Sequence, residues 1–555
     1  MIKNYLFAFA FALVAFSGYS QVTDLVEPKS WNNNLSDDNI ELVSMPFEDL
    51  ARYMEEDLSK TQGSMAKPYR FGAKLQTNVT RQSHGESITL ENDDVIWRVG
   101  FESVGAKTLN FIIRDYNLVE GAELYIYNAD RSMKMGPYTN NENNDINEIT
   151  TWPIDGDKVY VEFYEPSEVI GQSTFTITEL VHGYRSVPAN EAYAKALNDS
   201  GSCNIDVDCP LGDNFDLQKR SVVMLVSNGN GFCTGTLVNN TAEDRTPYIL
   251  TANHCWANPG QNAPVNTTRS YAFRFNWISP NPSCATFTNS TDGPFLQTLN
   301  GAIVRASDGD SDMLLLETTT ANAIPSDWDV VFAGWSRSTT TPTFTTGIHH
   351  PSGDIMKICR DNNPPSRTSV SFWGFTNRVW LINSGSNGGW EQGVTERGSS
   401  GSQLLDANGL LIGVLSGGSA ACSGTNDNGG FDYYGRLDRG WSDVSSFLDP
   451  IGTGTITTDH LENLALSVDD FDQTGFFQIY PNPSNGVIYF TSKLQSNEKL
   501  DYVLTDLQGK LVLKGTTDLR FDDQNEIQLK GITPGVYFLS FESENIKEVK
   551  KILIN

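Results

Sequence analysis

The sequence predicts an all-β protein of several domains, and three features carry this prediction. Its 555 residues far exceed the ~250–300 at which one hydrophobic core usually stops growing, so the chain should divide into domains. Residues 108–114 and 158–163 alternate apolar and polar side chains, which is the period of half-buried strands. Its 47 glycines favour strands and turns over long helices.

Five regions are expected along the chain. Residues 1–20 have the short apolar run and small residues of a secretory signal peptide. Residues 21–195 lack cysteine and alternate like a β-sandwich, which suits a removable propeptide. Residues 196–454 contain every cysteine and many short strands, as in a barrel-type domain. A polar linker at residues 455–473 should precede a small β-sandwich at residues 474–555.

The charge and the cysteines indicate an exported protein that does not bind nucleic acid. A formal net charge of −29 without clustered Lys and Arg argues against a phosphate-binding surface. No stretch after the signal peptide approaches the ~18 apolar residues of a membrane span, so we expect a secreted protein that does not cross a membrane, outside the cell or at its surface. Disulfides are the default in that setting, and seven cysteines leave one thiol over.

Three segments carry the residue types of a nucleophilic site. An apolar strand ends in His254, Asp312 opens a second apolar run, and a Gly-rich turn at residues 396–402 holds serines. A serine hydroxyl needs a base to take its proton, and a carboxylate fixes the tautomer of an imidazole base. We therefore expect Asp312 to orient His254 and His254 to activate a serine. The glycine at position 398 lets the amides of Gly398 and Ser400 approach a developing oxyanion.

Six pieces of the sequence recur together in the order of one known family. They are Ser-Gly-Ser-Cys203-Asn-Ile-Asp-Val, Cys233-Thr-Gly-Thr-Leu-Val, Thr-Ala-Asn-His254-Cys255, Ser-Asp312-Met-Leu-Leu-Leu-Glu, Ile-His349-His350-Pro and Gly-Val-Thr-Glu-Arg-Gly-Ser-Ser400-Gly-Ser. Over residues 200–454 the chain resembles the bacterial lysyl endopeptidases, which are chymotrypsin-like serine proteases. The resemblance implies two β-barrels with the site between them, a triad of His254, Asp312 and Ser400, and no metal or other cofactor.

The same resemblance implies three disulfides and one free thiol. Cys359 is an addition to the family pattern, and we expect it to be a buried small apolar residue rather than a reactive thiol. The third bridge would close a loop beside the base. The implied pairs are Cys203 with Cys422, Cys209 with Cys284, and Cys233 with Cys255.

Specificity for basic residues is expected from an acidic side chain at the floor of the substrate pocket. The aligned residue is Asp432, in Gly-Gly-Phe-Asp432-Tyr-Tyr. Asp427 is the alternative, because the loop after Cys422 is one residue longer than in the family. A carboxylate facing an ammonium at ~4 Å is worth about 4 kcal/mol at an effective dielectric of ~20, before desolvation costs.

Further residues bear on the choice between lysine and arginine. Trp373 matches a Trp that lines the site of the lysyl enzymes, although it is nearly as well explained as a core aromatic. Its stacking partner there is a His, and that position is Ser416 here, followed by Gly417 and Gly418. We count these residues as substrate-binding and expect lysine to be preferred. Cleavage after arginine is the alternative, because guanidinium and ammonium need different pocket geometry.

The junction between Lys195 and Ala196 is itself a lysyl bond, so we expect the precursor to cut itself there. In trypsin-like zymogens a freed N-terminus pairs with an Asp just before the nucleophile, but that position is Ser399 here. That ion pair cannot form. Removal of residues 21–195 is therefore expected to activate the chain by uncovering the cleft.

The C-terminal region resembles the sorting domains of the type IX secretion system. The matching pieces are Tyr480-Pro-Asn-Pro-Ser-Asn-Gly486, Asp506-Leu-Gln-Gly509-Lys510 and Gly535-Val-Tyr-Phe-Leu. The resemblance implies secretion machinery as a partner. A carbohydrate- or surface-binding β module is the alternative, without an evident aromatic platform.

Protein or peptide substrates with Lys or Arg before the cut bond are the other expected partner. Two competing functions are an inactive protease-like surface-binding module and a serine protease specific for acidic side chains, which an acidic pocket residue would repel. A metal site at His349 and His350 is not favoured, since no third ligand stands at a useful spacing.

Overall fold

The computed structural model falls into two compact units, residues 1–463 and 464–555, which are described separately. The signal-peptide region, Lys195, Ala196 and Trp373 lie outside the described residues. The described residues are 26–47, 49–59, 68–185, 197–257, 261–284, 289–293, 297–318, 324–325, 328–372, 375–383, 389–422, 426–463, 477–480, 482, 484, 486–492, 498–506, 510–519, 525–542 and 547–554.

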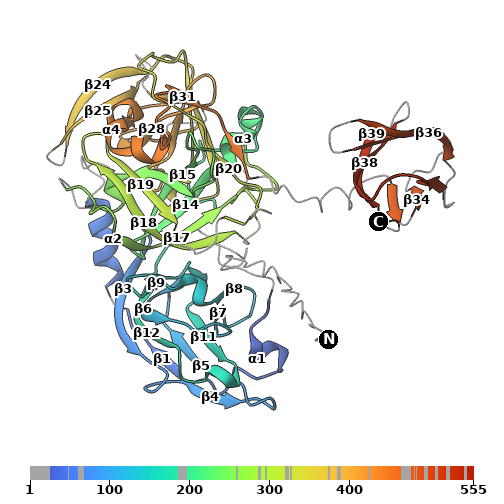
Figure 1. Cartoon of the computed structure of the whole chain (residues 1–555). Helices are drawn as coiled ribbons and strands as arrows, with labels where there is room; N and C mark the ends of the chain where they lie inside the picture. Colours follow the sequence, from blue (N-terminus) through green and yellow to red (C-terminus); the bar gives the residue numbers. More distant parts are fainter. Residues whose placement is uncertain are drawn as a thin grey trace, which may run out of the picture. The chain divides into compact units, whose positions relative to one another are not determined.

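Strands between residues 42 and 183 form two sheets that pack face to face (Figure 1). One has the order β1-β5-β11-β7-β8 with β4 beside β5, and the other has the order β10-β6-β12-β3 with β9 beside β6. Apolar side chains of both sheets share one core, in which the rings of Phe101 and Phe111 lie 4.9 Å apart. The bounds are β1 (Leu42–Ser44), β3 (Gly72–Val79), β4 (Glu86–Thr89), β5 (Val95–Glu102), β6 (Thr108–Asn117), β7 (Glu123–Asn128), β8 (Lys134–Tyr138), β9 (Glu148–Thr150), β10 (Ile154–Asp155), β11 (Lys158–Glu165) and β12 (Thr174–Gly183), with helix α1 (Lys29–Asn32) before β1 and helix α2 (Leu50–Ser59) after it.

The next region begins with a closed six-stranded barrel. Its order is β14-β17-β18-β19-β16-β15, and β15 pairs back onto β14. A short strand of the N-terminal region, β2 (Tyr69–Arg70), also pairs with β15. The bounds are β14 (Val222–Ser227), β15 (Gly231–Val238), β16 (Tyr248–Ala252), β17 (Thr268–Phe275), β18 (Thr298–Asp308) and β19 (Met313–Thr318).

A second large sheet follows and packs on this barrel. Its order is β24-β25-β30-β28-β27-β22-β23-β26-β29, with β13 beside β23 and β21 beside β28. One hydrophobic cluster contains side chains of both sheets, such as Leu250 and Leu315 of the barrel and Ile348 and Val414 of the second sheet. The bounds are β13 (Ile205–Asp206), β21 (Trp335–Ser336), β22 (Thr345–His349), β23 (Lys357–Asp361), β24 (Ser366–Phe372), β25 (Phe375–Ile382), β26 (Trp390–Gln392), β27 (Gln403–Leu405), β28 (Leu411–Gly418), β29 (Asn426–Asn428) and β30 (Asp432–Arg436), followed by α4 (Leu437–Leu448).

The predicted linker at residues 455–473 was wrong in its first part. There β31 (Thr457–Thr458) pairs with β21, and β32 (Leu461–Glu462) pairs with β20 (Val331–Phe332). Leu461 packs on the barrel core, and the amide of Asn463 donates to the carbonyl of Val330 at 3.0 Å. A polar stretch can join a sheet through its backbone, which composition alone does not reveal.

The C-terminal unit is a small sandwich of two sheets around its own core. One sheet is β33-β34-β37 and the other is β36-β35-β38-β39. Phe477, Phe490 and Phe541 form the aromatic centre of this core. The bounds are β33 (Phe477–Tyr480), β34 (Val487–Ser492), β35 (Glu498–Asp506), β36 (Leu511–Leu519), β37 (Asn525–Gln528), β38 (Gly535–Glu542) and β39 (Lys547–Ile554).

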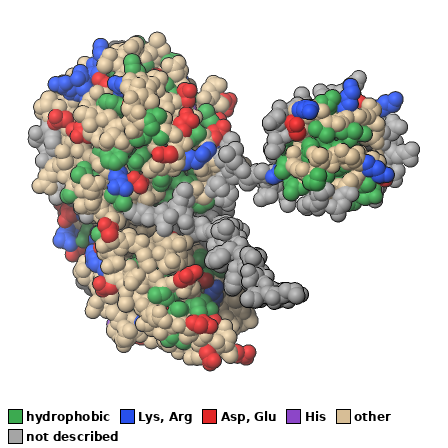
Figure 2. All heavy atoms as spheres, viewed as in Figure 1, with side chains coloured by type: hydrophobic (Ala, Val, Ile, Leu, Met, Phe, Trp, Pro, Cys, Tyr) green, Lys and Arg blue, Asp and Glu red, His purple; other side chains and the backbone are tan. Residues whose placement is uncertain are grey.

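The all-β class predicted from the sequence is confirmed by these sheets. A search of the described residues found no helix that is long and apolar enough to span a membrane. On the face drawn in Figure 2, acidic and basic side chains of the described residues are interspersed, and they form no extended basic patch there.

Candidate active site

The predicted base and its carboxylate partner meet at the adjoining ends of two paired strands. Ala252 at the end of β16 lies opposite Met313 at the start of β19, so His254 just after β16 comes beside Asp312 just before β19. His254 Nδ1 is 2.7 Å from Asp312 Oδ2, and the His254 amide donates to Asp312 Oδ1 at 3.0 Å. Both residues are buried. Two hydrogen bonds therefore fix the imidazole's orientation relative to the carboxylate.

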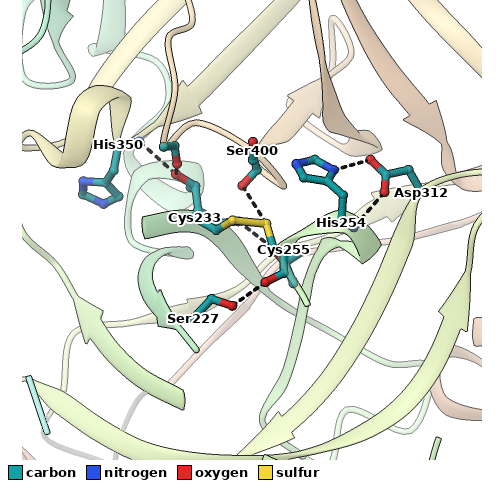
Figure 3. The surroundings of a disulfide bond; sticks show 10 residues. Ser227, Cys233, His254, Cys255, Asp312, His350 and Ser400 are labelled. Carbon is teal, nitrogen blue, oxygen red and sulfur yellow. Dashed lines mark hydrogen bonds and ion pairs between the residues drawn. A yellow bond between two sulfur atoms is a disulfide. The ribbon is translucent and has the colours of Figure 1, made fainter. Parts of the chain in front are cut away.

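Ser400 reaches the same place from the other sheet. It lies in the turn between β26 and β27, and the barrel strand β15 holds this turn, because the Thr234 amide donates to the Ser400 carbonyl at 2.8 Å. Figure 3 shows the His254 ring between Asp312 and Ser400. The structure thus brings together the three residues predicted as a triad.

The turn before Ser400 depends on glycine. Gly398 has φ +94°, and a Cβ there would lie 2.9 Å from the carbonyl oxygen of His350. The Gly398 carbonyl accepts from the Thr234 hydroxyl at 2.9 Å, and the same hydroxyl accepts from the His350 amide at 3.1 Å. The backbone around Ser399 is therefore held from the barrel side. The oxyanion role of the Gly398 and Ser400 amides stays a prediction.

All three predicted disulfides are confirmed, and Cys359 is free and buried. Burial raises the pKa of the Cys359 thiol well above its usual range, as expected for an unreactive cysteine. The bridge between Cys233 and Cys255 lies directly below the candidate triad (Figure 3). Its Cys255 sulfur is 3.8 Å from the Ser400 carbonyl oxygen.

Asp432 opens β30, opposite Gly418 of β28, and is 2 % exposed. Burial raises the pKa of the Asp432 carboxyl to about 6, although three donors favour its ionised form. Two are the side chains of Thr395, whose hydroxyl is 2.6 Å from Oδ2, and Trp390, whose Nε1 is 2.7 Å from it, and the third is the backbone amide of Ala420. A Cβ at Gly418 would lie 2.2 Å from the other carboxylate oxygen, so glycine leaves this oxygen room.

The remaining predicted pocket residues are placed unequally. Ser416 is fully buried on β28, and Gly417 beside it has φ +137°. Asp427, the alternative to Asp432, lies on β29, but its side chain is outside the described residues, as is Trp373. Whether Asp427 or Trp373 lines a pocket therefore stays untested.

Sequence reasoning missed the two residues that hold Asp432 and the partner of His349. Trp390 and Thr395 hold Asp432 from positions well before it in the chain. His349 is fully buried, and its Nδ1 is 2.7 Å from the Ser399 hydroxyl. The Ile-His-His-Pro piece pointed to this histidine, but no sequence pattern pointed to its partner. Among the described residues no group of three or more metal-ligating side chains was found.

Comparisons with known proteins match two parts of the chain. Residues 197–435 match the family model "Lysyl endopeptidase, C-terminal domain", and residues 478–555 match "Secretion system C-terminal sorting domain". The lysyl endopeptidase of Pseudomonas aeruginosa is 26 % identical over 312 residues, which are 54 % of this chain and 62 % of that relative. The chain therefore spans less than two thirds of that relative's length.

Two solved proteases share a distant likeness. A Glu endopeptidase in complex with MPD is 16 % identical, over 44 % of this chain and 94 % of that one, with a TM-score of 0.24. The HtrA-type protease AlgW with tripeptide is 12 % identical, over 61 % and 95 %, with a TM-score of 0.25. At these TM-scores neither carries an argument. The family models confirm the resemblance to lysyl endopeptidases and to secretion sorting domains. The sorting domain also confirms the expectation of a secreted protein.

Proposed function

We propose that this chain is the precursor of a secreted serine endopeptidase that cuts peptide bonds on the carboxyl side of basic residues, with lysine preferred. The observation that carries the proposal is the buried His254–Asp312 pair beside Ser400, within a region that matches the lysyl endopeptidase model. A serine, a base and an orienting carboxylate that lie side by side in this order are the parts that acyl transfer needs.

In the proposed reaction Ser400 Oγ attacks the scissile carbonyl carbon while His254 takes its proton. Asp312 keeps the imidazole in the tautomer whose free nitrogen faces the serine, and stabilises the imidazolium that forms. The amides of Gly398 and Ser400 donate to the oxyanion. The intermediate collapses when His254 gives its proton to the leaving amine. Water then attacks the acyl-enzyme with His254 as base, which releases the acid and restores Ser400.

Asp432 is proposed to select the basic residue before the cut bond. Its carboxylate is buried, and burial disfavours the ionised form. The ammonium of a bound lysine would stabilise that form by acting as its counter-ion. The attraction would be largest for the ionised form, so binding should also pull the Asp432 pKa down. Ser416 in place of the family's histidine leaves arginine as a second accepted residue.

Residues 21–195 are proposed to be a propeptide that is cut off at Lys195–Ala196. Contacts at the turn support this role, because Arg397, next to Gly398, donates to the carbonyl of Asp57 in α2 at 3.2 Å. The N-terminal region therefore contacts the Arg397 side chain, which belongs to the turn that carries Ser400. The C-terminal unit is proposed to engage the secretion machinery, as its family model indicates.

One experiment tests the proposal. The mature domain is incubated with a denatured protein, and the new termini are sequenced, with Ser400→Ala as the matched control. New termini after Lys, with fewer after Arg and none with Ser400→Ala, are expected. Cuts only after acidic residues would contradict the specificity, and no cuts at all would favour the inactive binding module instead.

A further inference from the structure

We propose that His349 is a positioning residue, which holds the turn that carries Ser400 in its active conformation through a hydrogen bond to Ser399. The inference rests on the proposed function and concerns how its nucleophile is kept in place. His349 ends β22, and its Nδ1 lies 2.7 Å from the Ser399 hydroxyl. Neither side chain is exposed.

Ser399 is the point at which the turn can be held. Its amide donates to the Glu396 carbonyl at 3.0 Å, and its carbonyl accepts from the Ser402 amide at 2.9 Å. Its hydroxyl accepts from the Glu396 amide at 3.2 Å in addition to the contact with His349. The residue stands between Gly398 and Ser400, whose amides are the proposed oxyanion donors. A rotation at Ser399 would turn both amides away from the developing charge, and donor direction decides how much such a hole contributes.

The imidazole is costly where it lies. Within the described part of the chain, His349 Nε2 is buried without a hydrogen-bond partner. A buried unpaired polar atom costs roughly 1–3 kcal/mol, so an apolar side chain of similar size would serve packing better. The one interaction that justifies a histidine here is the bond from its other nitrogen to Ser399.

The bond does not depend on pH in the working range. Burial, the neighbouring His350, and Lys357, which lies opposite His349 in the register of β22 and β23, lower the pKa of His349 to about 3. The charge of Lys357 is itself met by Asp206 and Asp354. A neutral imidazole can form a hydrogen bond with a serine hydroxyl. The ion pair found at this position in trypsin-like enzymes needs instead the ammonium of a freed N-terminus.

A consequence for activation follows. The nucleophile turn is already bonded in the uncut chain, without any freed N-terminus. Release of the N-terminal region would then have to uncover the site rather than rebuild it.

The test compares His349→Leu and Ser399→Ala with wild type in the hydrolysis of a lysyl peptide amide and in the rate of Ser400 labelling by a fluorophosphonate. We expect kcat and the labelling rate to fall about tenfold or more in each variant, somewhat less than the ~10²–10³ for removing an oxyanion donor outright, with KM within about twofold. The double variant should lose no more than the worse single variant. His349→Asn, whose side-chain amide can replace Nδ1, should regain most of kcat.

The matched control is His350→Leu, which also removes a fully buried imidazole but one whose Nδ1 bonds to the Asp354 carbonyl at 2.9 Å. It should change the thermal unfolding temperature by about as much as His349→Leu does and leave kcat near wild type. An unchanged kcat in Ser399→Ala, or an equal loss in His350→Leu, overturns the inference. If the wild-type protein reacts with the fluorophosphonate but does not cut peptides, only the proposed function is contradicted, because the labelling rate still reports on the turn. If it does neither, the proposed function and the inference are both overturned.

Discussion

At the scale of single residues, Asp432 shows how a functional charge is kept at the expense of stability. Its carboxylate accepts a hydrogen bond from Trp390, which belongs to a buried apolar cluster. Burial makes the charged form of Asp432 unfavourable. Trp390 and Thr395 compensate in part, since both donate to one oxygen. A carboxylate placed for packing alone would be replaced by a neutral side chain, so its charge indicates a ligand of opposite sign.

Asp432→Asn tests this trade directly. Cleavage after lysine should fall roughly 10²–10³-fold, because about 4 kcal/mol of attraction is lost. The variant should also gain stability at pH 7.5, by at most about 3 kcal/mol, since the wild-type pKa of about 6 stands two units above its unfolded value. Steady-state kinetics and urea unfolding measure the two effects, with Asp427→Asn as control. A larger loss of lysyl cleavage in Asp427→Asn would transfer the role to that residue.

The pH dependence has a definite sign. A carboxyl with a raised folded pKa binds its proton more tightly in the folded state, so its contribution to stability falls as pH rises from about 4 to 6. Asp432→Asn should thus match wild type near pH 3.5 and exceed it above pH 6.

Binding of a cationic ligand should have the opposite pH dependence. The affinity for an alkylammonium, measured by calorimetry, is expected to fall about tenfold per unit as pH drops below about 6, because protonated Asp432 is neutral. Binding is measured rather than turnover, because turnover also requires the catalytic base to be deprotonated. A flat profile in wild type, equal to that of Asp432→Asn, would show that another group binds the cation.

At the scale of elements, the Cys233–Cys255 bridge joins β15 to the turn that presents His254. Removing it as Cys233→Ala with Cys255→Ala should cost roughly 3 kcal/mol of stability and lower kcat, since the bridge lies beneath both His254 and Ser400. The control pair is Cys209→Ala with Cys284→Ala, whose longer loop predicts a cost of roughly 4.5 kcal/mol but no specific loss of kcat. Guanidinium unfolding and kinetics below each midpoint separate the cases. Equal kcat in both double variants would show that the Cys233–Cys255 bridge does not position His254 or Ser400.

A second element joins the N-terminal region to the barrel. Phe71 follows β2, stacks on Phe232 of β15 at 4.3 Å, and is fully buried. Phe71→Ala should cost the precursor about 3–5 kcal/mol and expose the amides of β15 that pair with β2 to hydrogen exchange. Phe175→Ala removes an equally large ring within the sandwich core and should leave those amides protected. Protection of β15 in both variants would mean that the interface is held elsewhere.

Some contacts of this fold could be predicted from the sequence, and others could not. The all-β class, the three bridges, and the meeting of His254, Asp312 and Ser400 were predictable, because short motifs and the resemblance to a known family indicate them. The partners of Asp432 and Ser399 were not, because Trp390 and His349 reach them through tertiary packing that leaves no local pattern. The pairing of β31 and β32 was missed for a related reason, since backbone hydrogen bonds carry it.

At the scale of the whole molecule, the N-terminal region, the barrel and the second large sheet form one compact unit, while the C-terminal region forms another. The hydrophobic core of the sandwich extends into the barrel through Met224, Val226 and Phe232. The N-terminal region and the barrel region of the uncut chain are thus parts of one folded unit, in which the nucleophile turn is already bonded. We therefore expect a cut at the junction to be sufficient for activation.

Self-cleavage is the prediction that follows at this scale. Purified precursor, residues 21–555, should convert to a form that begins at Ala196, whereas precursor with Ser400→Ala should stay intact, because the junction bond after Lys195 is itself a substrate. Mass spectrometry of the N-terminus reads the cut, and Lys195→Gln is the control that removes the site but keeps the triad. The rate at several dilutions then separates a cut within one molecule, which is independent of concentration, from a cut between molecules, which slows on dilution. Maturation of pure Ser400→Ala precursor at Ala196 would contradict self-cleavage. Trace wild-type enzyme added to that variant should restore the cut only if one molecule can process another.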